Sequence, residues 1–265
     1  MNDFFAGQVF NSYEYFGAHK ESGRIVFRTF APNAANVCIF GSFNNWSEEP
    51  MTQESYGVYS FVSDSADFGD MYKYVIYTKS GERFEHCDPY GFGMELRPQW
   101  ASYIVDLSEY KFTDDKWMDC RNKNYNSPMN IYEVHLGSWL NNPQNENGWY
   151  NYSEIADKLI QYAKKHKYTH LEFLPLSEHP ADCSWGYQNT GFFSPTSRYG
   201  TAAQLMELVD KCHKNNIGVI MDFVPVHFAV DGYGLAQYDG SYLYEYPPSD
   251  VGISEWGTCN FNHSR

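Results

Sequence analysis

Short runs of alternating apolar and polar residues fill the first part of the chain, from about residue 13 to residue 106. The alternation is clearest at residues 24–30, 36–40, 58–62 and 72–77. Such alternation predicts strands with one buried face, and Gly, Asn, Asp and Ser separate these runs as turn formers. The pattern is typical of an antiparallel, immunoglobulin-like β-sandwich.

The pattern changes after about residue 129, where apolar runs at residues 130–136, 169–174 and 217–221 predict three more strands. Helical periodicity appears between them. Ser153 is the predicted N-cap of the first helix, which carries Ile155, Leu159 and Ala163 on one face.

The second predicted helix begins at a capping box formed by Thr201 and Gln204 and ends at Asn215 and Asn216. Its apolar face comprises Leu205, Leu208, Val209 and Cys212. Strands that alternate with helices predict a parallel sheet with right-handed crossovers.

The chain is therefore predicted to be multidomain. Residues 1–110 form the sandwich, the polar segment 111–128 is a linker, and residues 129–265 contain three strands of a parallel α/β unit. A hydrophobic fraction of 43% supplies enough apolar residues for real cores.

The net charge limits the classes of possible binding partner, and the cysteine usage bears on the cellular compartment. A formal net charge of −14 disfavours nucleic acid and anionic membranes as partners. The six cysteines show no C-x-x-C spacing, and no metal-ligand pattern or cofactor motif is visible. The start of the chain lacks a signal-peptide pattern, and no apolar run approaches the length of a membrane span. We expect a reduced, cytoplasmic protein, and the sequence leaves its oligomeric state open.

The candidate chemistry lies where the predicted parallel strands end. Asp222 follows the third strand directly, and His227 comes five residues later. Tyr187 lies in the long aromatic loop after the second strand. Since the carboxyl ends of parallel strands share one edge, the three side chains should converge there. An aromatic ring beside a carboxylate and an imidazole suits a sugar, whose face stacks and whose hydroxyls form hydrogen bonds.

These segments resemble the glycogen branching enzymes of the alpha-amylase superfamily (glycoside hydrolase family 13). The first part is similar to carbohydrate-binding module family 48. The blocks that carry the resemblance are FGAH at 16–19, GSFNNW at 41–46, DPY at 88–90, YEVHLGSW at 132–139, WGYQ at 185–188, SRYG at 197–200, DFVPVH at 222–227 and WGTCNFN at 256–262.

The resemblance implies that residues 129–265 are the first three strands of a (β/α)8 TIM barrel, which is incomplete here. It also implies that Tyr187 stacks on a glucosyl unit and that Asp222 and His227 hydrogen-bond its hydroxyls. The expected partner is an alpha-glucan such as glycogen or amylose. The parent protein would cleave an alpha-1,4-glucan and transfer the chain to a 6-hydroxyl. Trp46 is expected to be a packing aromatic of the sandwich, with glucan contact as the alternative.

A retaining mechanism needs two carboxyl groups roughly 5 Å apart, and no convincing pair is visible here. Glu172 lies inside the second strand and Asp182 in the loop after it. By the resemblance, the nucleophile and the acid/base would lie beyond Arg265, so residues 1–265 alone should be inactive. The alternatives are a truncated, non-catalytic glucan-binding protein and a related debranching or trehalose-releasing glycoside hydrolase.

Overall fold

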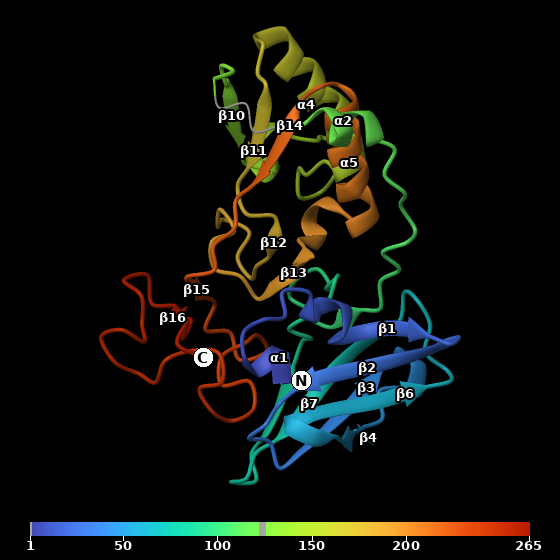
Figure 1. Ribbon diagram of the computed structural model, residues 1–265, viewed down its shortest axis with the longest axis vertical. Helices are drawn as coiled ribbons and strands as arrows, with labels where there is room; N and C mark the ends of the chain where they lie inside the picture. The colour runs from blue at the N-terminus through green and yellow to red at the C-terminus, as the bar shows by residue number, and fades with distance from the viewer. Residues whose placement is uncertain (1, 122–125) are drawn as a thin grey trace.

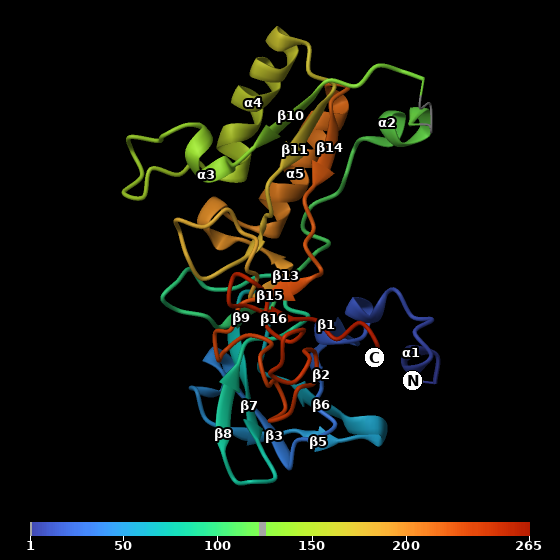
Figure 2. The ribbon, with the colours of Figure 1, turned by 90° about the vertical axis from the view of Figure 1, so that its left-hand side faces the viewer.

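The computed structural model describes residues 2–121 and 126–265. Two antiparallel sheets form one end of the molecule, and a parallel sheet flanked by helices forms the other, as Figure 1 and Figure 2 show. Residues 122–125 of the predicted linker lie outside the described residues.

Two facing antiparallel sheets make up the sandwich. The first has the order β1 (Gly17–Glu21), β2 (Arg24–Phe30), β6 (Val58–Ser63) and β5 (Thr52–Gln53). The second has the order β4 (Glu49–Pro50), β3 (Asn36–Gly41), β7 (Met71–Tyr77) and β8 (Arg83–His86), and β9 (Ser102–Tyr103) also pairs with β7. Ile25, Phe27 and Thr29 point inward from β2, as its alternation predicts.

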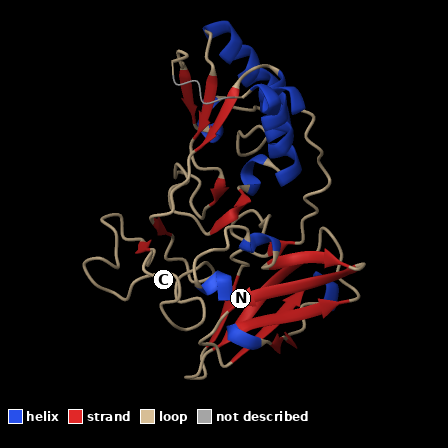
Figure 3. Ribbon diagram, in the orientation of Figure 1, coloured by secondary structure: helices blue, strands red, loops and turns tan. Residues whose placement is uncertain are grey.

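The parallel sheet consists of β10 (Ile131–Val134), β11 (His170–Phe173) and β14 (Gly218–Met221) in that order. Helices α4 (Tyr152–His166) and α5 (Ala202–Lys214) pack beside this sheet (Figure 3). Leu171 and Phe173 are fully buried in the core that these helices share with the sheet. The strand order confirms the parallel crossovers that the sequence predicts.

The two helix starts differ in how well the sequence predicts them. The capping box of Thr201 and Gln204 at the start of α5 is confirmed. The N-cap of α4 is Asn151, in a capping box with Glu154, so the prediction of Ser153 is wrong. Ser153 lies inside α4, where its hydroxyl donates to Glu207 of α5. Asn151 and Ser153 are both good caps by residue type, and only Asn151 has a glutamate three residues later.

Shorter elements connect these parts. They are α1 (Asn2–Phe5), η1 (Ser12–Glu14), η2 (Ser42–Asn44), η3 (Ser55–Gly57), α2 (Asp115–Cys120), α3 (Leu136–Trp139), β12 (Ser177–Glu178), β13 (Gly191–Pro195), η4 (Ser197–Tyr199), β15 (His227–Phe228) and β16 (Cys259–Asn260). Strands β12 and β13 pair as an antiparallel hairpin within the loop after β11, and β15 pairs with β16.

The chain after β14 returns to the sandwich, where both ribbon views place its red segment (Figures 1 and 2). Tyr238 and Leu243 belong to the sandwich core, and the hydroxyls of Tyr238 and Thr29 share a 2.7 Å hydrogen bond. The backbone N–H of Cys87 donates to the carbonyl of Tyr233 at 2.9 Å. Residues of the segment after β14 therefore complete the core of the sandwich.

Buried carboxylates fix the segment between the sandwich and the parallel sheet to α5, and Asp114 of this segment contacts Nδ1 of His213 in α5 at 2.6 Å. Asp210 accepts hydrogen bonds from the hydroxyl of Tyr110 at 2.7 Å and from the backbone N–H of Thr113 at 2.8 Å. Farther along the chain, the ring of Trp117 in α2 stacks on His213, with centroids 5.0 Å apart.

Candidate functional site

The loop between β11 and η4 presents aromatic side chains at the carboxyl edge of the parallel sheet. Gly186 forms its turn with a φ of +91°, a conformation that favours glycine. A Cβ at this position would lie 2.5 Å from the carbonyl oxygen of Pro175, so the close approach of residue 186 to Pro175 requires a glycine. Gly186 thereby presents Trp185, which is 65% exposed, and the half-buried Tyr187.

Tyr187 and Asp222 meet across this edge. The phenol of Tyr187 donates to Oδ2 of Asp222 at 2.6 Å. Asp222 directly follows β14, and its backbone N–H donates to the carbonyl of Phe173 in β11 at 3.0 Å. Burial, followed by the hydrogen bond and charge of Asp222, raises the pKa of Tyr187 to about 12. Tyr187 is therefore a hydrogen-bond donor across the physiological range.

His227 begins β15 and is only 5% exposed. Its ring lies 5.5 Å from that of Trp256, centroid to centroid, and its Nδ1 has no hydrogen-bond partner among the described residues. Burial lowers the pKa of His227, so the imidazole is neutral at pH 7. A buried polar atom without a protein partner is suited to receive a ligand or a water.

A pocket of about 700 Å³ lies between the loop that carries Tyr187 and the segment from Val224 to His227. It is lined by Cys183, Ser184, Trp185, Tyr187, Gln188, Val224, Val226, His227 and Trp256. Two of the three predicted binding residues, Tyr187 and His227, are therefore in its wall. Asp222 is not in the lining, and it touches the pocket through the hydroxyl of Tyr187.

Trp185 and Trp256 also line the pocket, and the sequence did not predict them as binding residues. Trp185 lies in the same WGYQ segment as Tyr187, which is a usable local signal. Trp256 lies about 30 residues after His227 and reaches the pocket because β16 pairs with β15. No local spacing indicates that contact.

Three other carboxylates lie near this edge of the sheet, on Glu133, Glu172 and Asp182. Glu133 and Glu172 lie opposite each other in the parallel register of β10 and β11. Asp182 is held by two arginines, Arg97 and Arg198. The site thus combines aromatic faces, a phenol donor and a neutral imidazole.

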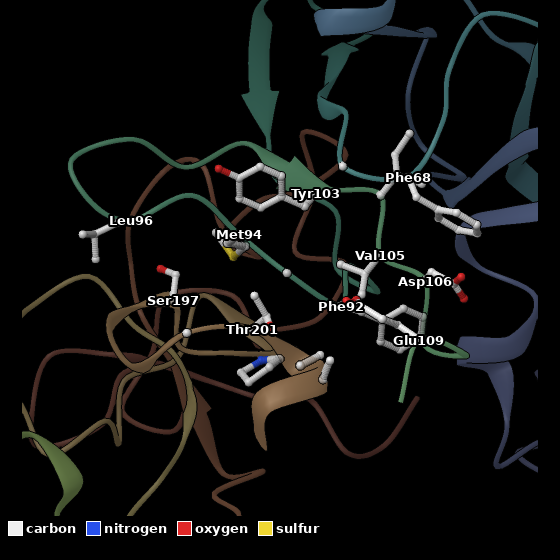
Figure 4. Close-up of a pocket in the computed structure, with 17 residues that line it drawn as sticks. Phe68, Phe92, Met94, Leu96, Tyr103, Val105, Asp106, Glu109, Ser197 and Thr201 are labelled. Carbon is white, nitrogen blue, oxygen red and sulfur yellow. The ribbon is translucent and has the colours of Figure 1, made fainter. Parts of the chain in front are cut away.

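A second cavity, of about 640 Å³, lies between the sandwich and the start of α5 (Figure 4). Met94 and Leu96 lie on its sandwich side, and Ser197 and Thr201 on its α5 side. None of the predicted binding residues lines it.

Trp46 is 41% exposed, at a left-handed turn position with a φ of +58°. Its ring packs edge-on against Phe40, with centroids 5.5 Å apart, and Nζ of Lys73 lies over the ring, 5.8 Å from its centroid, so Trp46 is a turn-packing aromatic.

Within residues 2–121 and 126–265, no three His, Cys, Asp or Glu side chains gather where they could hold a metal ion. Over the same residues, no helix combines the length and apolarity that crossing a bilayer requires.

Two family models match the chain. Carbohydrate-binding module 48 (isoamylase N-terminal domain) matches residues 15–91, and the alpha amylase catalytic domain matches residues 137–242. The first match covers most of the sandwich, and the second covers β11 to β14 with both large helices.

Curated relatives are similar over nearly the whole chain. The 1,4-alpha-glucan branching enzyme GlgB of Fusobacterium nucleatum is 45% identical over 269 residues, covering 99% of this chain and 43% of that protein. The enzymes of the same name from Francisella tularensis and Gloeobacter violaceus are 45% and 41% identical, each over 99% of this chain. The chain spans 42% and 37% of those two proteins, less than half of their length.

Solved structures share the fold. The pullulanase of Paenibacillus barengoltzii in complex with maltohexaose and alpha-cyclodextrin superposes with a TM-score of 0.72 at 20% identity, over 97% of this chain and 47% of that one. The catalytic module of the pneumococcal virulence factor SpuA gives 0.72 at 18% identity, over 96% and 43%.

These likenesses confirm the predicted fold class, a sandwich followed by the first strands of an alpha-amylase barrel. The chain thus joins a stretch that matches carbohydrate-binding module 48 to a stretch that matches the alpha amylase catalytic domain, and over 99% of its length it is similar to part of a 1,4-alpha-glucan branching enzyme.

Proposed function

We propose that this chain supplies the carbohydrate-binding module and one wall of the glucan site of a 1,4-alpha-glucan branching enzyme. The observation that carries the proposal is the pocket bounded by Trp185, Tyr187 and Trp256, with Nδ1 of His227 lacking a hydrogen-bond partner in the described part of the chain. Aromatic faces bind the apolar faces of glucose rings, and buried polar atoms select hydroxyls by hydrogen bonding. The 41–45% identity to branching enzymes favours that activity over debranching.

The proposed roles follow from the contacts. Tyr187 stacks on a glucosyl unit, and its hydroxyl holds Asp222 in place. Asp222 accepts hydrogen bonds from the hydroxyls of that unit, and His227 accepts from them or donates to them. Because His227 is neutral, one ring nitrogen donates and the other accepts, which matches the two-way chemistry of a sugar hydroxyl.

The full reaction requires two carboxyl groups, one as nucleophile and one as acid/base. The parent enzyme would cleave an alpha-1,4 bond, hold the released chain as a covalent glycosyl-enzyme, and pass it to a 6-hydroxyl of another glucan. Asp222 is engaged by Tyr187, and Asp182 by Arg97 and Arg198. We propose that the nucleophile and the acid/base come from parts of the longer protein that this chain does not include.

The domain limits and the compartment complete the proposal. The limits are residues 1–110 for the module, 111–128 for the linker and 129–265 for the barrel part. All six cysteines, each within the described residues, are unpaired, which suits the reducing cytoplasm. The proposed partner is an alpha-glucan such as glycogen or amylose.

Calorimetric titration of the 265-residue chain with maltohexaose tests the binding role. We expect measurable affinity that Tyr187→Ala abolishes, because that change removes both the stacking face and the donor to Asp222. Tyr56→Ala is the matched control, since Tyr56 is an exposed tyrosine of the sandwich. Equal affinity of the Tyr187→Ala and unaltered chains would refute the site.

An iodine-stained amylose assay tests the catalytic part. The chain alone should leave the iodine spectrum unchanged, because Asp222 and Asp182 are engaged by other side chains and the proposed nucleophile and acid/base belong to other parts of the longer protein. A spectral shift produced by the purified chain would show that the reacting carboxylates lie within it. Binding to glucan without turnover in every longer product of the gene would favour the non-catalytic alternative.

A further inference from the structure

One carboxylate, Asp182, connects the sandwich to the loop that carries the pocket aromatics. Nε of Arg97 donates to Oδ1 of Asp182 at 2.6 Å, and a second contact joins Nη2 of Arg97 to Oδ2. Nε of Arg198 donates to the same Oδ1 at 2.8 Å. Asp182 precedes Trp185 by three residues and Tyr187 by five. The two guanidinium groups therefore clamp the loop just before its functional end.

Arg198 is itself held in a buried hydrogen-bond network. The Arg198 side chain is 1% exposed, and its Nη1 donates to Glu178 at 2.7 Å and to the carbonyl of His179 at 2.8 Å. Glu178 also accepts from the backbone N–H of Ser197 at 2.7 Å. Arg198 and Glu178 thus join the two ends of the β12–β13 loop within the barrel part.

The Arg97 side comes from the sandwich. Arg97 lies in the segment that passes from β8 to β9, and its neighbour Leu96 borders the interdomain cavity opposite Ser197 (Figure 4). Backbone and side-chain hydrogen bonds between Glu95 and Ala101, both 2.9 Å, close this segment into a loop. The guanidinium of Arg97 also lies over the ring of Trp149, 5.7 Å from its centroid.

The contacts of Asp182 should increase the conformational order of the loop between Glu178 and Gly191. Residues 181–183 and Trp185 are exposed, so burial contributes little to ordering this part of the loop. Ordering a free loop when a ligand binds costs conformational entropy, and a contact that orders it beforehand removes that cost from the binding step.

We propose that Arg97 is a positioning residue: through Asp182, the sandwich module preorganises residues 182–188 for glucan binding. This inference rests on the proposed function of the pocket. Arg97 and Asp182 are 34% and 37% exposed, so the pair is partly screened and its effect is modest. Its bidentate geometry and the shared Arg198 make it stronger than an isolated surface pair. The module thereby acts on the glucan site without touching the sugar.

Three variants of the 265-residue chain test the inference. Arg97→Met keeps the aliphatic stem and removes the guanidinium, Arg97→Lys keeps the charge and loses the fork, and Arg83→Met is the control. Arg83 is an arginine of the sandwich that pairs with Glu48 and Glu85, all within that module. We expect Arg97→Met to raise the Kd for maltohexaose about three- to tenfold, Arg97→Lys to restore part of the affinity, and Arg83→Met to change nothing.

Two readouts separate positioning from general destabilisation. Cys183 follows Asp182 and lines the pocket, so its alkylation by iodoacetamide, followed by mass spectrometry, reports the order of the loop without any sugar. Alkylation should be faster in Arg97→Met than in the unaltered chain, at an unchanged melting temperature. The affinity gap between the two should also narrow as salt rises, because salt screens the ion pair.

The outcomes are distinct. If the unaltered chain does not bind maltohexaose, the proposed function fails and the inference fails with it. If the unaltered and Arg97→Met chains bind equally well, or Cys183 reacts at the same rate in both, only the positioning role of Arg97 is overturned.

Discussion

Tyr187 and Asp222 lie 35 residues apart in sequence and are joined by a 2.6 Å hydrogen bond. Neither residue is positioned by its own local sequence alone. The glycine turn at Gly186 aims the phenol, and the pairing of β14 with β11 places the carboxylate. The contact converts two loops at one sheet edge into a single surface, which is how parallel α/β units build binding sites.

Tyr187→Phe should weaken maltohexaose binding less than Tyr187→Ala does. The phenylalanine keeps the stacking face and loses only the donor to Asp222, so we expect a Kd roughly ten- to a hundredfold higher, consistent with one hydrogen bond to a charged group. Titration calorimetry of the three proteins checks the order. Equal losses in the two variants would mean that stacking contributes nothing.

Tyr238→Ala should destabilise the sandwich strongly although Tyr238 lies far outside it in sequence. The residue is fully buried in the sandwich core, so truncation should cost about 3–5 kcal/mol of unfolding free energy. Tyr238→Phe loses only the hydrogen bond to Thr29, for about 1 kcal/mol. Urea denaturation measures both. Tyr56→Ala, at an exposed site, should stay within about 0.5 kcal/mol.

The fragment of residues 1–110 should be less stable than the sandwich within the whole chain. It lacks Tyr238 and Leu243, which fill its core, and the carbonyl of Gly234, which binds Nδ1 of His86 at 2.9 Å. Hydrogen exchange of β2 and β7 amides in the fragment and the full chain makes the comparison. Equal protection would show that the sandwich core is complete by itself.

Unfolding free energy should fall as the pH drops from about 6.5 towards 4. Burial, partly offset by the hydrogen bond to Gly234, lowers the pKa of His86 to about 4. Between pH 6.5 and 4, the imidazole of His86 is protonated in the unfolded state but not in the folded state, so acid favours unfolding. A shift of this size corresponds to about 3 kcal/mol. His86→Asn, whose amide can still donate to Gly234, should show a shallower decline in urea titrations at pH 7 and 4.5.

Asp210→Ala should lower the unfolding free energy, because it breaks the contact between residues 110–113 and α5. The side chain is fully buried, and its loss leaves Tyr110 and Lys214 without their partner, for about 3 kcal/mol. Burial alone would raise the pKa of Asp210, but hydrogen bonds from Tyr110, Thr113 and Lys214 lower it to about 2. Its stabilising effect is therefore present above about pH 4 and is lost as the pH falls through 2. Asp64→Ala, at an exposed aspartate, is the control for urea denaturation.

Local patterns in the sequence predict much of this fold. The alternation in residues 24–30 and the capping box at Thr201 both act within a few residues, and both appear in the structure as predicted. The N-cap of α4 shows the limit of such reasoning, since Asn151 and Ser153 compete and the glutamate at 154 decides.

Contacts of long range could not be predicted in the same way. Tyr238 enters the sandwich and Trp256 reaches His227 only because the chain after β14 folds back. Likewise, Asp182 was only a loosely placed loop carboxylate in the sequence, and its two arginines come from positions 97 and 198. The binding roles of Tyr187, Asp222 and His227 stay predictions that the titrations above will test.

The hydrogen bond between Thr29 and Tyr238 also sets an order of events during synthesis, because 209 residues separate its two ends. At ribosomal rates of roughly 5–20 residues per second, the chain grows for on the order of 10–40 s between these two points. In the later part of that interval, after β9 has been made, all the sandwich strands exist while Tyr238 is still missing from their core. The nascent protein therefore carries an open apolar surface that chaperones can occupy until the returning segment closes it.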